Sequence, residues 1–138
     1  AGFTAPDAPV EPWISVNPNH VEINAAEEFD DPDSVYTFYK KLIAMRHNNA
    51  TVAVGEWNLV AADSEQVYSF TRTSGDDTIL VIVNLTGRTA RVPAEVARLL
   101  GNGVGESQVL LSTYDAMHSV KSIARGELAR WEGVVIQL

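Results

Sequence analysis

The stretch that decides the fold reads VYSFTRTSGDDTILVIVNL and runs from Val67 to Leu85. Residues 67–72 alternate between two faces with the period of two that a half-buried strand requires. A turn signal follows at 74–77, and residues 78–84 form a run rich in β-branched side chains, as expected for a strand buried on both faces. The pattern therefore predicts two antiparallel strands joined by a hairpin.

Further short strands are predicted on both sides of this hairpin. They are expected at 51–54, 57–60, 89–92, 109–112, 120–123, 128–131 and 134–138, with a helical turn at 93–100 and a flexible glycine-rich loop at 101–105. Short strands separated by turn signals at this spacing are typical of an antiparallel sandwich or barrel. The sequence from residue 50 to residue 138 is therefore predicted to form a mainly β domain, an antiparallel β-sandwich.

Upstream of the β region, the spacing of apolar residues becomes helical. The sequence DPDS at 31–34 has the composition of a helix start, because Asp31 can cap the helix and Pro32 suits its first turn. Apolar side chains then recur at helical spacing from Val35 to Ile43, which predicts one helix from Pro32 to His47. Residues 1–19 are rich in proline and lack apolar periodicity, so an extended loop is expected there.

The composition excludes several classes of function. The formal net charge is −8, which argues against a nucleic-acid partner because phosphate binding needs clustered Lys and Arg. The chain has no cysteine, which excludes disulfides and thiolate metal sites and fits a cytoplasmic protein. The longest apolar run, Ile79 to Val83, is too short to cross a bilayer. The opening residues include no initiator methionine, so we expect the chain to begin inside a longer protein.

The sequence offers no convincing catalytic or metal-binding constellation, and no cofactor is implied. Asp30, Asp31 and Asp33 lie at the predicted helix start, where capping explains them. Asp76 and Asp77 lie in the hairpin turn, where aspartate is ordinary. The histidines are far apart and lack metal-ligand spacing. Their positions are 20, 47 and 118.

The three tryptophans lead to different expectations. Trp57 and Trp131 belong to β-rich segments, so core packing is the expected role of both. Exposed aromatic residues would instead indicate a carbohydrate-binding module that stacks sugars. Trp13 lies in the N-terminal loop and has no such context of its own.

Three stretches resemble a known family, the oligo-1,6-glucosidases and related bacterial α-glucosidases of the α-amylase superfamily. The first, AGFT at 1–4 with PWISVNPN at 12–19 and EIN at 22–24, resembles the segment after the eighth barrel strand of these enzymes. The second, residues 31–47, resembles their last barrel helix. The third, residues 128–138 with Trp131 and Glu132 inside it, is similar to the closing strand of their C-terminal β domain.

The resemblance implies a division of the chain at residue 49. Residues 1–49 would be the terminal loop and last helix of a (β/α)₈ catalytic barrel, and residues 50–138 a C-terminal Greek-key β-sandwich. The aspartate nucleophile and the glutamate acid/base of this retaining family lie upstream of the matched region, so no catalytic residue is expected here. The resemblance also places Trp13 near the rim of the parent active site, as a substrate-binding residue only in the context of that barrel.

Two classes of function follow. In the first, the chain is part of an α-glucosidase, braces its barrel partner and is inactive alone. In the second, it is a self-contained module that binds sugar or associates with itself. Because the helix face from Val35 to Ile43 would have lost its barrel partner, a homodimer formed through this face is also expected.

Overall fold

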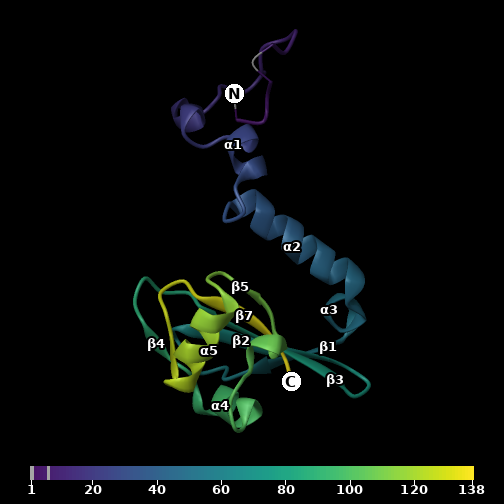
Figure 1. Ribbon diagram of the computed structural model, residues 1–138, viewed down its shortest axis with the longest axis vertical. Helices are drawn as coiled ribbons and strands as arrows, with labels where there is room; N and C mark the ends of the chain where they lie inside the picture. Colours follow the sequence, from purple (N-terminus) through teal and green to yellow (C-terminus); the bar gives the residue numbers. More distant parts are fainter. Residues whose placement is uncertain (1, 6) are drawn as a thin grey trace. The chain divides into compact units, whose positions relative to one another are not determined.

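The computed structural model describes residues 2–5 and 7–138 (Figure 1). The chain forms two units, one ending at Ala44 and the other comprising Met45–Leu138. The first unit contains the short 3₁₀ helix η1 (Pro18–Val21), helix α1 (Ala25–Asp30) and most of helix α2 (Val35–Asn48). The second contains every strand that the structure describes.

Helix α2 confirms the predicted helix but begins three residues later than predicted. The backbone N–H of Asp33 donates to Asp31 Oδ1 at 2.8 Å, which closes a turn before the helix. Ser34 then provides the cap, because its Oγ accepts a hydrogen bond from the Thr37 N–H at 3.1 Å. The acidic and proline residues therefore shape the approach to the helix, and the serine starts it.

Helix α3 (Ala50–Val54) occupies the position where a strand was predicted at 51–54, so that prediction is wrong. Asn49 Oδ1 accepts from the Val52 N–H at 3.0 Å and caps the first turn. Gly55 ends the helix, with its N–H donating to the Thr51 carbonyl at 3.0 Å. A Cβ at Gly55 would lie 2.5 Å from that carbonyl oxygen, so only glycine fits. These caps outweigh the β propensity of the threonine and valines between them.

The main sheet has five strands in the order β1-β2-β3-β7-β5, and every neighbouring pair is antiparallel. Its strands are β1 (Glu56–Val60), β2 (Val67–Ser74), β3 (Asp77–Asn84), β5 (Val109–Ser112) and β7 (Gly133–Gln137). The hairpin between β2 and β3 is confirmed, with Ser74 opposite Asp77. Gly75 in its turn has a φ of +61°, a conformation that glycine adopts without steric cost. The predicted antiparallel β architecture is therefore confirmed.

The second layer of this unit is smaller and partly helical (Figure 1). Its sheet consists of β4 (Ala90–Arg91) and β6 (Glu127–Leu128), accompanied by α4 (Ala94–Leu100), the 3₁₀ helix η2 (Glu106–Gln108) and α5 (Ala116–Ala124). The strand predicted at 120–123 is wrong, because Asp115 Oδ1 accepts from the His118 N–H at 2.7 Å and begins a helix there. The strand predicted at 128–131 ends at Leu128.

The core lies between the main sheet and this second layer. It joins buried side chains of β3 and β7 to those of α4, α5 and the small sheet. Its buried residues are Val67, Leu80, Ile82, Ala90, Val96, Leu100, Ile123, Leu128, Val134 and Ile136. On the opposite sheet face, α3 packs on β2 and β3, and Ile79 is fully buried.

Candidate functional site

Trp13, the residue predicted to contact substrate, lies in a bend of the N-terminal unit with 94% of its surface exposed. A cavity of about 90 Å³ in the same unit is lined by other residues. Its lining is Gly2, Phe3, Ile23, Asn24, Ala25, Glu28 and Tyr36. An indole this exposed needs a second surface before it can orient a sugar, so the substrate contact of Trp13 stays a prediction.

The acidic residues singled out from the sequence lie in turns or at the ends of helices and strands. Asp31 caps the turn before α2, as described above, and Asp77 begins β3 at the hairpin. In α1, the Glu27 N–H donates to the capping oxygen of Asn24 at 3.0 Å. Retaining glycoside hydrolysis needs two carboxyl groups about 5–5.5 Å apart, one of them an acid with a raised pKa. The local roles of these acids are therefore structural.

Sequence analysis did not predict the burial of Glu132, whose side chain is 0% exposed. Its Oε1 accepts from Ser119 Oγ at 2.7 Å, and its Oε2 accepts from the Ala129 N–H at 2.6 Å. Ser112 Oγ lies 2.8 Å from Ser119 Oγ and accepts from the Tyr114 N–H. A hydrogen-bonded chain thus joins β5, α5 and the turn before β7.

His118 lies beside this buried carboxylate, yet the group is not a catalytic triad. The His118 Nε2 atom is 3.4 Å from Ser122 Oγ and 3.9 Å from Glu132 Oε2. A Ser-His-acid triad uses the two ring nitrogens separately, one for the nucleophile and one for the acid. Here both groups approach the same nitrogen, so the cluster links α5 to the sheet and does not activate a serine.

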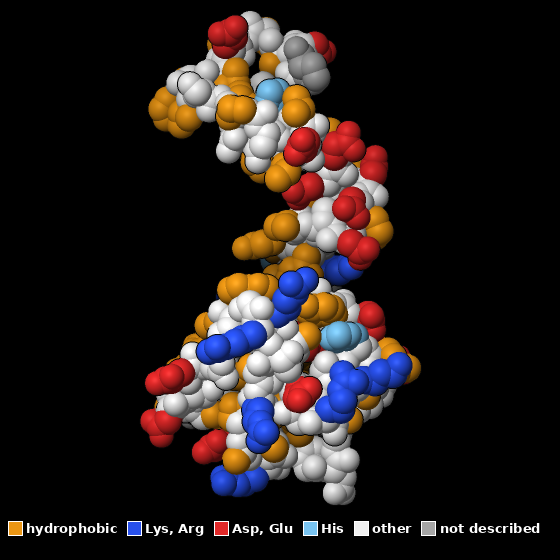
Figure 2. Space-filling model, turned by 90° about the vertical axis from the view of Figure 1, so that its left-hand side faces the viewer, with side chains coloured by type: hydrophobic (Ala, Val, Ile, Leu, Met, Phe, Trp, Pro, Cys, Tyr) orange, Lys and Arg blue, Asp and Glu red, His pale blue; other side chains and the backbone are white. Residues whose placement is uncertain are grey.

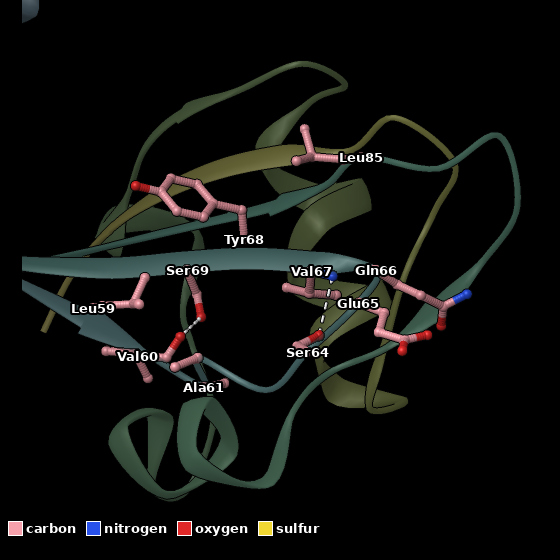
Figure 3. A pocket seen from close by; sticks show the side chains of 11 residues that line it. Leu59, Val60, Ala61, Ser64, Glu65, Gln66, Val67, Tyr68, Ser69 and Leu85 are labelled. Carbon is pink, nitrogen blue, oxygen red and sulfur yellow. Dashed lines mark hydrogen bonds between the residues drawn. The ribbon is translucent and has the colours of Figure 1, made fainter.

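A groove of about 310 Å³ opens between β1, β2 and the loop that connects them (Figure 3). Two hydrogen bonds hold its wall: Ser69 Oγ donates to the Val60 carbonyl at 2.7 Å, and the Val67 N–H donates to Ser64 Oγ at 3.1 Å. Glu65 is the single acidic residue in its lining. The groove therefore has no second carboxyl group for glycoside hydrolysis.

The prediction that Trp57 and Trp131 pack in the core is wrong, since they are 47% and 60% exposed. Trp57 lies on β1, an edge strand, and its ring is 6.3 Å from that of Phe70 on β2. Phe70 in turn lies 5.6 Å from Tyr68. Trp131 lies in the turn after β6, where strand alternation no longer sets which side a side chain faces.

The N-terminal unit exposes nearly all of its apolar side chains. The predicted face of α2 is open, with Val35, Tyr39 and Ile43 all more than half exposed. Its other exposed large apolar residues are Phe3, Val10, Trp13, Ile14, Val21, Ile23, Phe29 and Tyr36. Apolar surface gathered in this way marks an interaction surface more often than a free one.

Among residues 2–5 and 7–138, no group of three or more His, Cys, Asp or Glu is arranged to hold a metal ion. Within the same described residues, no helix is long and apolar enough to cross a membrane.

Known proteins resemble this chain in both sequence and structure. Residues 1–55 match the family model of the α-amylase catalytic domain. The whole chain is 34% identical to the oligo-1,6-glucosidase of Parageobacillus thermoglucosidasius and 33% identical to that of Bacillus cereus, and it covers 23% of each. The trehalulose synthase MutB of Pseudomonas mesoacidophila MX-45 superposes with a TM-score of 0.73 at 31% identity, over 92% of this chain and 22% of the synthase.

These matches show that the chain is similar, over nearly all of its length, to enzymes of the α-amylase superfamily. Within it, the relatives of the chain are α-glucosidases, the oligo-1,6-glucosidases among them. The chain spans about a quarter of the length of the curated relatives that it matches.

Proposed function

We propose that the chain is the C-terminal part of an α-glucosidase that acts on α-linked gluco-oligosaccharides, where it braces a (β/α)₈ catalytic barrel and contributes no catalytic carboxylate. The observation that carries this proposal is the open apolar face of α2, formed by Val35, Tyr39 and Ile43. Its relatives are full-length enzymes about four times longer, which have further chain to cover such a face.

In this proposal, the two parts of the chain have different structural roles, and the boundary between them is the predicted one at residue 49. Residues 1–49 would complete the barrel with its terminal loop and last helix, and residues 50–138 would form the C-terminal domain. The match of residues 1–55 to an α-amylase catalytic domain supports this division. Each large apolar side chain that the barrel covers would contribute about 1.5–3 kcal/mol to the stability of the longer protein. The lack of cysteine supports a cytoplasmic location for that protein.

On the sheet face opposite the core, the part that α3 leaves exposed supports a second contact with the barrel. A row of neighbouring rings lies there, formed by Trp57, Phe70 and Tyr68.

In the proposed parent enzyme, Trp13 would lie near the rim of the active site. The barrel would supply the second wall that its exposed indole lacks. The chemistry itself needs a carboxylate pair that these residues do not provide, so no cofactor or metal enters the proposal.

The first test is activity. A purified preparation of the 138-residue chain should not hydrolyse p-nitrophenyl α-glucoside above the rate of a blank. The full-length enzyme that contains this sequence should hydrolyse it readily. Turnover by the isolated chain, retained through further purification, would contradict the proposal.

The second test measures how much the contact between α2 and the barrel stabilises the full-length enzyme. Tyr39→Ser in the full-length enzyme should lower its unfolding free energy by about 1.5–3 kcal/mol, because a covered ring is lost. The same substitution in the isolated chain should change stability by less than about 0.5 kcal/mol. Ala44→Ser, an exposed position on the same helix, is the matched control. Equal effects of Tyr39→Ser in both proteins would rule out the proposed covering of α2.

Self-association is the second candidate, and the open face from Val35 to Ile43 favours it. Two copies could cover each other through this face and form a homodimer. Sedimentation of the isolated chain over a hundredfold range of concentration tests this directly. A monomer at every concentration refutes the homodimer, whereas a dimer that Ile43→Ser dissociates supports it.

A further inference from the structure

Trp131 has a backbone conformation that a bulky residue rarely adopts. Its φ is +55°, and glycine is the usual occupant of this region because a side chain is crowded there. Ala61, with a φ of +54°, is the other non-glycine residue of this kind that the structure describes. Strained residues persist where the surrounding structure determines them, and they gather at ligand sites. The indole of Trp131 is nevertheless 60% exposed, so burial does not explain it.

Hydrogen bonds from two other loops fix the turn that carries this side chain. The Trp131 N–H donates to the Thr86 carbonyl at 3.0 Å, and Thr113 Oγ1 donates to the Trp131 carbonyl at 3.3 Å. Tyr114 donates through its hydroxyl to the Arg130 carbonyl at 2.9 Å. The buried Glu132 accepts from the Ala129 N–H and closes the turn from within. The exposed indole is therefore held on a rigid support.

The indole lies close to Gly87 and is otherwise largely exposed. A Cβ at Gly87 would lie 3.5 Å from a carbon of the indole, so a side chain at this position would contact the ring. Tyr114, whose hydroxyl reaches the same turn, is stacked on His118 with ring centroids 4.4 Å apart and an angle of 11°. Arg88, which follows Gly87 in the chain, is exposed and carries hydrogen-bond donors.

We propose that Trp131 is the stacking platform of a surface site for an α-linked gluco-oligosaccharide. The apolar face of a pyranose ring would lie on the indole, and its hydroxyl groups would meet the polar side chains beside it. An aromatic ring held in place loses little conformational freedom on binding, which suits a weak carbohydrate ligand. The choice of ligand rests on the proposed function, because the oligo-1,6-glucosidases are the relatives of this chain.

The site is tested by titrating the isolated chain with isomaltotriose while following the indole N–H signals of its three tryptophans by NMR. The signal of Trp131 should shift with a dissociation constant of about 1 mM, and that of Trp57 should stay in place. Trp131→Gly should weaken binding at least about tenfold and leave the melting temperature unchanged or higher, because glycine accepts the φ of this position. Trp131→Tyr keeps a ring and should retain part of the affinity.

The matched control is Trp57→Thr, which removes another half-exposed indole from an edge strand and should leave binding unchanged. An immobile Trp131 signal at about 50 mM sugar overturns the site, and so does unchanged affinity in Trp131→Gly. If Trp131→Gly unfolds the chain, Trp131→Tyr decides: reduced affinity with an intact fold supports stacking by the indole, and unchanged affinity overturns it. The two proposals fail separately. If no indole signal shifts with sugar and the chain has no glucosidase activity, the sugar site alone is contradicted. If the chain turns over the glucoside, the proposed function alone is contradicted.

Discussion

The two units of this chain differ in how far they bury their apolar side chains. Among the described residues up to Ala44, the single buried side chain is the polar Ser34. The unit Met45–Leu138 holds all of the buried hydrophobic core, including Leu80 and Ile136 at 0% exposure. A segment with helices but no core of its own draws its stability from a partner. The comparison therefore shows which part of the chain is self-supporting.

The units also differ in charge. The residues up to Ala44 carry eight acidic and two basic side chains, whereas the β unit carries ten and eight. Acidic side chains gather on the N-terminal unit in Figure 2, and Lys and Arg are spread over the visible face of the β unit. The acidic excess lies around α1 and the start of α2, where negative charge favours helix N-termini. A net charge far from zero favours solubility, which offsets the effect of exposed apolar side chains.

The largest expected effect lies in the β core. Leu80→Ala removes a fully buried side chain of β3 and should lower the unfolding free energy of the isolated chain by about 2–5 kcal/mol. Urea denaturation followed by circular dichroism measures it. The control Leu99→Ala removes a 43% exposed leucine from α4 and should cost much less. A cost below about 1 kcal/mol for Leu80→Ala would remove the contrast between the two units.

A smaller effect is expected at the buried carboxylate. Glu132→Gln replaces one acceptor oxygen by a donor that faces either Ser119 Oγ or the Ala129 N–H. Either the Ala129 N–H loses its acceptor, or the Ser119 hydroxyl turns to donate to Ser112 Oγ; loss of the charged acceptor costs about 1–3 kcal/mol. Glu127→Gln, at an exposed position on β6, is the control for loss of charge alone. Equal stability of the two variants would show that the polar cluster does not hold the second layer in place.

The cap of helix α3 should contribute less again. Asn49→Ala removes the side chain that accepts from the Val52 N–H and should cost about 1 kcal/mol. Asn58→Ala, exposed on β1, is the matched control for removal of an asparagine. Asn49→Asp should retain most of the stability, because aspartate also caps. If it does not, a contact other than the cap makes Asn49 important.

The smallest effect is expected on the open helix. Ile43→Ala should change the stability of the isolated chain by less than about 0.5 kcal/mol, because the side chain is 54% exposed. Thermal melts of the wild-type chain and the variant at low concentration measure the difference. A cost comparable to that of Leu80→Ala would mean that this face of α2 is covered in the isolated chain.

The elements that sequence analysis identified correctly are those with a local signature. The hairpin from Val67 to Asn84 combines a period of two with a glycine turn, and α2 combines a period of 3.6 with a capping sequence. The missed helices α3 and α5 are short, and their residues favour strands as much as helices. A single side chain caps each of them, Asn49 in one case and Asp115 in the other. Both capping residues are visible in the sequence, but the β-branched residues that follow them led to the prediction of strands.

By itself, the sequence determined that the chain has an antiparallel β region after an amphipathic helix, because those periods and turns act between near neighbours. Only the tertiary structure decided that Glu132 is buried while Trp131, one residue earlier, faces solvent. Both positions depend on distant segments: the pairing of Val134 with Ile82 and Ser112 brings α5 over the carboxylate, and the loop at Gly87 supports the indole. Contacts between residues tens of positions apart leave no periodic trace in the sequence.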